Sequence, residues 1–171
     1  RGHMFSTRGH CAVSFVRYCS TQASRQKKML VVGGNGFVGG HICQAALTAG
    51  CKVYSLSRSG RPTRNEPWMD KVNWIVGDAE QIPSGEYKEV LANTDAVVTA
   101  IGAFGSNEFM ERMCGDINIK VLENAKDAGV SKAGFVSVHA VRNLNSFPPL
   151  KGYFGGKRRA EDAMKRIFGG K

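Results

Sequence analysis

The sequence predicts a doubly wound α/β fold, in which helices cover both faces of a parallel sheet. Two observations carry this prediction. Strand-like and helix-like segments alternate along the chain, and the central strand segments are apolar throughout, as in sheets that are buried on both faces. Right-handed crossovers then place five strands in the order 3-2-1-4-5. The length of 171 residues, 42% of them hydrophobic and 22% charged, fits one globular domain.

The individual elements follow from apolar runs, helical periodicity and glycine stops. Strands are expected at 29–32, 52–57, 72–76, 95–101 and 133–139, and helices at 37–49, 85–92, 108–128 and 151–168. In the helix 37–49, the side chains expected to face the sheet are Val38, Ile42, Ala45 and Ala49. The segment 108–128 is expected to be one continuous helix, because an apolar row runs along its whole length.

The net charge of +10 is concentrated at the start of the chain. Residues 1–65 contain ten Lys or Arg and no acid, whereas residues 66–171 contain fourteen of each sign. The neutral second part argues against a nucleic-acid partner, which needs a basic face on the folded domain. Residues 1–27 form a basic leader rich in Arg and Ser, which is typical of an organelle transit peptide; a disordered basic tail is the alternative. Arginine dominance favours the mitochondrion over the plastid, and the folded domain is expected at 28–171.

No apolar run approaches the ~20 residues that a membrane-spanning helix needs, so no transmembrane helix is expected. The five Cys and four His show no metal-ligand spacing, and no metal site is predicted.

A glycine-rich loop joins the first strand to the first helix. Gly33, Gly36 and Gly39 have the spacing G-x-x-G-x-x-G, within a strand–helix–strand unit. Such a loop lets the backbone approach a pyrophosphate, which binds the free N–H groups at the helix N-terminus. The predicted cofactor contacts in this region are Gly33, Asn35, Gly36, Phe37, Val38 and Gly39.

The end of the second strand selects the cofactor. A site that prefers NAD(H) places Asp or Glu there, but this chain has Ser57, Arg58 and Ser59 and no acid nearby. The Arg58 guanidinium can pair with a 2′-phosphate, and Ser57 or Ser59 can donate to it, which favours NADP(H) with NAD(H) as an alternative. A solvated loop arginine is the competing interpretation.

Later strand ends supply further candidates for cofactor binding. Asp78 and Ala79 follow the third strand, where a carboxylate can accept from an adenine amino group; Asp78 can equally cap its own turn. Ala100, Ile101 and Gly102 end the fourth strand, where small residues such as Ala100 and Gly102 let the backbone lie against a cofactor.

Tyr153 and Lys157 form a Y-x-x-x-K motif on the last helix. Residues four apart share a helix face, so the lysine cation is expected to lower the tyrosine pKa and to bind the nicotinamide ribose. The tyrosine could then transfer a proton while hydride moves at carbon.

These motifs together resemble the short-chain dehydrogenase/reductase superfamily, and most closely its atypical, NmrA-like branch. The resemblance rests on the stretches LVVGGNGFVGGHICQAALTAG, CKVYSLSRSGRP, GAFGSN and GYFGGKRRAE. They are similar to plant organelle NAD(P)-binding proteins and to a fungal short-chain-dehydrogenase-like factor of coenzyme Q biosynthesis. A more distant similarity is to the NADPH-carrying accessory subunit of respiratory complex I.

The sequence departs from that family at two places. Active members have a Ser or Thr near the end of the fifth strand, where this chain has Ala140, with His139 or Ser137 as candidate carbonyl donors. Members also continue into a sixth strand and a C-terminal substrate region, whereas this chain stops at Lys171. The fold is therefore expected to be truncated before that region.

The resemblance and its departures imply an NADP(H)-binding accessory or assembly subunit, weakly catalytic or inactive. Its expected partners are proteins of a mitochondrial inner-membrane complex on the matrix side, either complex I or a coenzyme Q complex. The alternative is an NADPH-dependent oxidoreductase that uses Tyr153 and Lys157 on a lipid or quinone-related substrate. A redox-sensing regulator is a third hypothesis.

Overall fold

The computed structural model describes residues 25–81, 86–139 and 148–169. Most of the predicted leader 1–27, together with Ala140, lies outside these residues. The five strands form one parallel sheet in the order β3-β2-β1-β4-β5, which confirms the predicted order. The strands are β1 (Lys28–Val32), β2 (Lys52–Ser57), β3 (Val72–Val76), β4 (Ala96–Thr99) and β5 (Lys132–Phe135).

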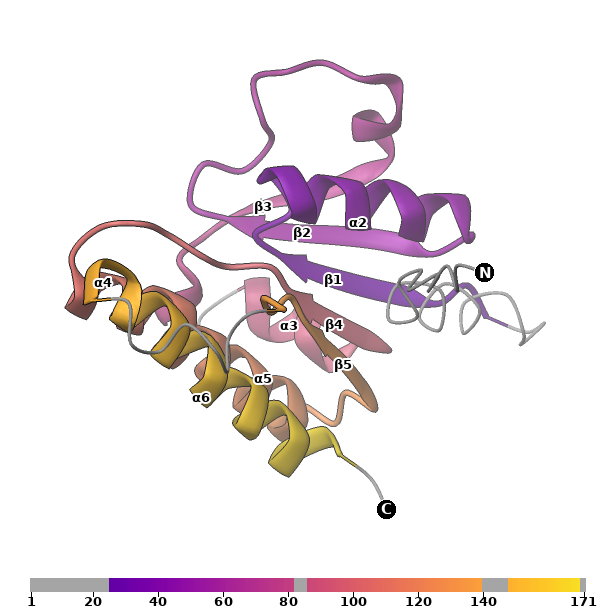
Figure 1. Cartoon of the computed structure of the whole chain (residues 1–171). Helices are drawn as coiled ribbons and strands as arrows, with labels where there is room; N and C mark the ends of the chain where they lie inside the picture. The colour runs from indigo at the N-terminus through magenta and orange to yellow at the C-terminus, as the bar shows by residue number, and fades with distance from the viewer. Residues whose placement is uncertain (1–24, 82–85, 140–147, 170–171) are drawn as a thin grey trace, which may run out of the picture.

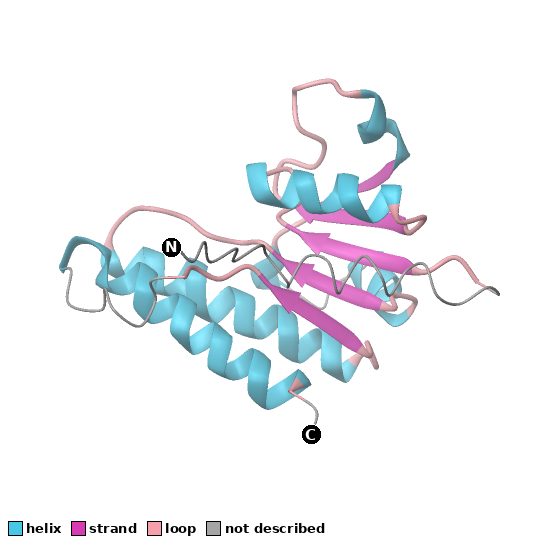
Figure 2. Ribbon diagram, turned by 45° about the vertical axis from the view of Figure 1, so that its right-hand side comes forward, coloured by secondary structure: helices cyan, strands magenta, loops and turns pink. Residues whose placement is uncertain are grey.

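Helices cover the sheet on both faces (Figure 1). Helix α2 (Phe37–Thr48) packs over β1 and β2, where its Cys43 and Ala46 join the alternate strand residues Val31 and Val53 in one apolar cluster. The opposite face is covered by α3 (Glu86–Ala92), α5 (Ile117–Asp127) and α6 (Lys151–Phe168), as Figure 2 shows. Of the described helices, none is long and apolar enough to cross a membrane.

The face of α2 that meets the sheet differs from the prediction. Val38 is 46% exposed and Ala45 is also exposed, whereas Gly39, Cys43 and Ala46 are buried. The cause lies at Gly39, because a Cβ at this position would overlap the carbonyl group of Gly33. Only a glycine can occupy this close contact with the β1 turn, so the helix is rotated to place Gly39 there, and the other inward positions follow from the helical repeat.

Helical backbone runs through 107–127, close to the predicted helix 108–128, but one turn of it is π-helical, which the apolar periodicity does not predict. The structure has α4 (Asn107–Glu111), a π-helical segment Arg112–Asp116 and α5 in succession. The fully buried Asn118 donates from Nδ2 to the carbonyl oxygens of Met113 and Cys114, both at 3.0 Å. A buried amide inside an apolar row thus binds the carbonyls at the π-helical segment.

Helix α6 packs closely against the π-helical segment and its flanking helices. A Cβ on Gly115 would lie 3.0 Å from Gly156 Cα, so the two backbones meet without an intervening side chain. At the start of α6, the N–H of Gly152 donates to Asn107 Oδ1 at 2.8 Å, and Asn107 Nδ2 donates to the Pro148 carbonyl at 3.1 Å. These contacts fix α6, which carries Tyr153 and Lys157, relative to α4 and the π-helical segment.

A carboxylate joins β1 to β4 at the opposite, amino end of the sheet. Asp95 accepts from the backbone N–H of Lys28 at 2.8 Å and from Arg25 at 2.6 Å, and Lys27 Nζ lies 3.5 Å away. Burial by itself raises the pKa of Asp95. The Lys28 hydrogen bond and the two cations outweigh burial and hold this pKa below its usual range.

We expect Asp95→Asn to lower the free energy of unfolding by about 1.5–3 kcal/mol at pH 7, as for hydrogen bonds to charged groups. Because the folded pKa lies below the unfolded one, the stabilisation is present above the unfolded pKa of about 4 and is lost as pH falls through the folded value. Urea unfolding at pH 7, 5 and 3 measures it, with the exposed Asp162→Asn as the charge-matched control. A deficit in Asp95→Asn that stays constant down to pH 3 would contradict this account.

Candidate functional site

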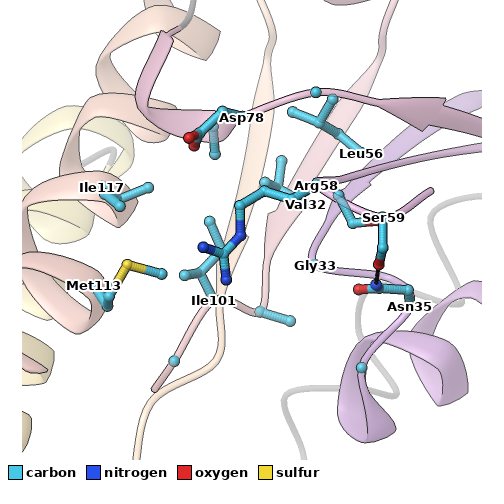
Figure 3. A pocket seen from close by; sticks show the side chains of 16 residues that line it. Val32, Gly33, Asn35, Leu56, Arg58, Ser59, Asp78, Ile101, Met113 and Ile117 are labelled. Atoms are coloured by element: carbon cyan, nitrogen blue, oxygen red, sulfur yellow. Dashed lines mark hydrogen bonds between the residues drawn. The ribbon is translucent and has the colours of Figure 1, made fainter. Parts of the chain in front are cut away.

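A cleft with a volume of about 220 Å³ lies at the carboxyl ends of β1, β2, β3 and β4 (Figure 3). Most of the predicted cofactor residues line it. They are Gly33, Asn35, Gly36, Ser57, Arg58, Ser59, Asp78, Ala79, Ala100, Ile101 and Gly102. Ligands bind at this edge in open α/β sheets, because the strand order reverses beside the first strand.

The glycine loop forms one wall of the cleft. Gly33 has φ +87°, a conformation that favours glycine, and a Cβ there would lie 3.3 Å from the carbonyl of Ala100. Gly36 precedes the first turn of α2, which has no side-chain cap and no acidic residue. The first N–H groups of α2 therefore have no partner within the helix and favour an anion at this end.

Three residues predicted in this loop do not line the cleft: Phe37, Val38 and Gly39. Phe37 is 76% exposed and forms an edge contact with His41, at 4.8 Å between ring centroids. Because α2 begins at Phe37, the side chains of its first turn project outward, and Gly39 is buried against Gly33. Any contribution of these residues to binding comes from their backbone N–H groups.

The turn after β2 directs one arginine into the cleft. Figure 3 shows the Arg58 side chain extending into the cleft, with its guanidinium group on the side of Ile101 and Met113. Arg61 instead pairs with Asp70 at 2.7 Å. A third arginine of this loop, Arg64, lies 3.4 Å from Glu66 Oε1.

Asp78 both faces the cleft and caps its own turn. Its Oδ1 accepts from the N–H of Glu80 at 2.9 Å, and Asp78 lines the cleft. The cleft also has lining residues that the sequence analysis missed: Val32, Leu56, Gly77, Met113 and Ile117. The sequence places these residues in strands, a turn and a helix, and only the fold brings them together at the cleft.

The ammonium group of Lys157 lies next to Ile101 and Gly102, which both line the cleft. Lys157 is only 3% exposed, and its Nζ donates to the carbonyls of Ile101 at 3.0 Å and Val136 at 2.8 Å. It lies 3.6 Å from the position of a Cβ on Gly102, which lines the cleft. Lys157 and Tyr153 are absent from the cleft wall, but the lysine cation adjoins it.

Tyr153 lies in a more apolar environment than the motif predicts. Its ring stacks on that of the exposed Phe104, with 5.1 Å between centroids and an interplanar angle of 9°. Burial, with a smaller contribution from Cys114, raises the pKa of Tyr153. The expected lowering by the lysine is not found, since Lys157 Nζ lies 6.0 Å from the tyrosine ring centroid, and burial lowers the pKa of Lys157 itself.

A second polar side chain shares the Ile101 carbonyl. Asn118 Nδ2 donates to it at 3.2 Å, while Thr99 Oγ1 donates to Asn118 Oδ1 at 2.6 Å. Asn118 was not predicted from the sequence, although a polar residue next to Ile117 of the apolar row was the available signal. Of the candidate carbonyl donors, His139 is exposed, and the Ser137 hydroxyl is buried with no hydrogen-bond partner among the described residues.

The sheet order, the glycine turn and the cleft define a dinucleotide-binding Rossmann domain. A family model described as NAD(P)H-binding matches residues 33–167, and the chain belongs to this family. Within the described ranges, no cluster of three or more His, Cys, Asp or Glu could hold a metal ion.

Two relatives show the similarity in sequence. An uncharacterised chloroplastic protein of Arabidopsis thaliana is 44% identical over 137 residues, which cover 80% of this chain and 45% of that protein. MIOREX complex component 2 of Saccharomyces cerevisiae is 44% identical over 86 residues, covering 47% of this chain and 30% of that protein. The chain thus spans less than half the length of these relatives.

A solved structure supports the fold. The UDP-glucuronic acid 4-epimerase from Bacillus cereus, in complex with NAD, superposes with a TM-score of 0.63 at 20% identity. The match covers 83% of this chain and 53% of that one. At this identity, the similarity concerns the architecture of the domain.

We expect Asn118→Leu to lower the free energy of unfolding by about 3 kcal/mol. Leucine approximately preserves the volume but leaves the Thr99 hydroxyl and buried carbonyls without their partner, at about 1–3 kcal/mol for each such group. Urea unfolding monitored by circular dichroism measures the change. Asn93→Leu is the control, because this exposed amide bonds only to a carbonyl at the end of α3, and it should change stability by about 0.5 kcal/mol at most. A loss below about 1 kcal/mol for Asn118→Leu would show that the buried network adds little stability.

Proposed function

We propose that this domain binds NADP(H) in preference to NAD(H). The observation that carries the proposal is the position of Arg58, which points into the cleft while Arg61 and Arg64 of the same loop lie beside Asp70 and Glu66. The planar fork of an arginine matches a phosphate group, and such charge-assisted hydrogen bonds are the strong ones.

The absence of an acid after β2 supports the same preference. In NAD(H) sites, a carboxylate at this position accepts from the ribose hydroxyls, and it would repel a 2′-phosphate. Residues 57–65 contain no Asp or Glu, and the first acid of the chain is Glu66, which lies beside Arg64.

We further propose that the protein is an accessory or assembly subunit of an organelle complex, with little catalytic activity. The yeast relative is named as a component of a complex and the Arabidopsis relative as chloroplastic. The basic leader 1–27 favours a mitochondrion, with an inner-membrane complex as host. The raised pKa of Tyr153 and the replacement of the expected Ser or Thr by Ala140 support weak activity.

An NADPH-dependent oxidoreductase is the second candidate function. The observation that favours it is the position of Lys157, whose ammonium group adjoins the cleft at Ile101 and Gly102. There it could reach a nicotinamide ribose, with Tyr153 as the proton donor to a lipid or quinone-related carbonyl. When bound, the nicotinamide ring would supply the hydride.

The cofactor preference has a direct test. We expect calorimetry to give a lower Kd for NADPH than for NADH, and Arg58→Gln to reduce this preference by about 10-fold or more, as for a charge-assisted hydrogen bond. Arg61→Gln removes the same charge from the same loop, but from a side chain that pairs with Asp70, and should leave the preference within about twofold. Equal affinities of the unmutated chain for the two cofactors would overturn the proposal.

Catalysis is tested separately from binding. In the accessory role, we expect the chain to oxidise NADPH no faster than buffer when offered short-chain quinones and aldehydes, measured at 340 nm. The raised pKa of Tyr153 and the lack of a carbonyl donor at Ala140 are the reasons, since one such donor contributes about 10²–10³ in rate. NADPH-dependent turnover that Tyr153→Phe abolishes would establish the enzyme instead.

A further inference from the structure

We propose that Asn35 and Ser59 form a hydrogen-bond relay that recognises the 2′-phosphate beside Arg58. In this relay, Ser59 is the donor to the phosphate, and Asn35 is a positioning residue that acts through Ser59. The inference rests on the proposed preference for NADP(H) and deepens it, because it names the groups that distinguish the two cofactors.

The two serines of the β2 turn differ in where their hydroxyl protons go. Ser57 Oγ donates to the Gly60 carbonyl at 3.0 Å, so its single proton is committed within the turn. Ser59 Oγ instead accepts from Asn35 Nδ2 at 2.8 Å, so its own proton stays available for an anion. Of the two hydroxyls predicted from sequence as phosphate donors, the geometry favours Ser59.

The Asn35–Ser59 bond also connects two separate parts of the cleft. Asn35 belongs to the glycine loop and Ser59 to the turn after β2, and both side chains line the cleft with Arg58 (Figure 3). A ribose bound between these two segments would place its 2′-substituent near both of them. A 2′-hydroxyl is a weak partner for this group of donors, whereas a phosphate offers charged acceptor oxygens.

The β2 turn is fixed independently of Asn35. The Ser57 hydroxyl and the backbone N–H groups of Gly60 and Gly77, which donate to the Ser57 carbonyl at 3.3 and 3.0 Å, hold the turn in shape. What remains free is the side-chain rotation of the exposed Ser59, and the Asn35 amide selects one orientation of its oxygen. An amide that donates to a hydroxyl also polarises it, which strengthens the donation from that hydroxyl to a phosphate.

The test is a double-mutant cycle on the ratio of Kd for NADH to Kd for NADPH, measured by calorimetry. We expect Ser59→Ala to lower this ratio about 10-fold and Asn35→Ala about threefold. The double variant should match Ser59→Ala alone, because Asn35 acts only through Ser59. Ser59→Thr, which keeps the hydroxyl, should preserve most of the ratio.

Arg64→Gln is the matched control, because it removes a positive charge from the same loop outside the cleft lining, and the ratio should stay within about twofold. Thermal melting checks that each variant is folded; should Asn35→Ala unfold, Asn35→Ser takes its place, since its side chain is too short to reach Ser59.

The outcomes separate the relay from the proposed cofactor preference. A ratio near 1 in the unmutated chain overturns both. A high ratio that falls in Arg58→Gln but not in Ser59→Ala overturns the relay and leaves the NADP(H) preference intact. Additive losses in the double variant overturn the positioning role of Asn35, because the two side chains then act independently.

Discussion

The close contact between Gly39 of α2 and the Gly33 carbonyl is the constraint on which the site depends. No side chain fits between the helix and the β1 turn, because a Cβ on Gly39 would overlap the Gly33 carbonyl group. On its other side, Gly33 lies against Ala100 at the end of β4. The contact therefore connects β1, α2 and β4, and it brings the free N–H groups of α2 to the edge of the cleft. A larger residue at position 39 would move the helix start away from any bound anion.

A second glycine contact performs the same task for α6. Gly115 and Gly156 bring α6 within backbone distance of the π-helical segment, and Lys157 follows one residue after Gly156. This places the lysine ammonium group at the Ile101 carbonyl, where Asn118 also donates. Backbone contacts thus fix the N-terminus of α2, with its free N–H groups, on one side of the cleft and the buried Lys157 ammonium group on the other.

The elements with strong local signals could be predicted from sequence. Apolar runs and glycine stops located the strands, and the right-handed crossover rule fixed their order. The spacing of Gly33, Gly36 and Gly39 located the glycine turn at the edge of the cleft, and most of the proposed contacts line the cleft. These features depend on local sequence or on rules that hold for nearly all parallel sheets.

The errors arose where a long-range contact overrides the local pattern. The helical repeat alone predicted that Val38 faces the sheet, because the repeat contains no information about the contact between Gly39 and the Gly33 carbonyl. Periodicity predicted the helix at 108–128 but not its π-helical turn, because the partner of Asn118 on β4, Thr99, cannot be inferred from the helix sequence alone. The distinction between Ser57 and Ser59 likewise depends on Asn35, which is 24 residues from Ser59 in sequence.

The environment of Lys157 gives the lysine of the Tyr–Lys motif a structural role that does not depend on catalysis. Burial of an unpaired ammonium group costs free energy unless its donors are satisfied, and two of them bind the carbonyls that follow β4 and β5. The nearby Phe135 ring, 4.8 Å from Nζ, adds a cation–π contact. Removing the ammonium group would leave both carbonyls without this donor beside the cleft wall, whether or not any hydride transfer takes place. The lysine therefore has a structural role in shaping the cofactor cleft, and its spacing from Tyr153 does not by itself distinguish an enzyme from a domain that only holds its nucleotide.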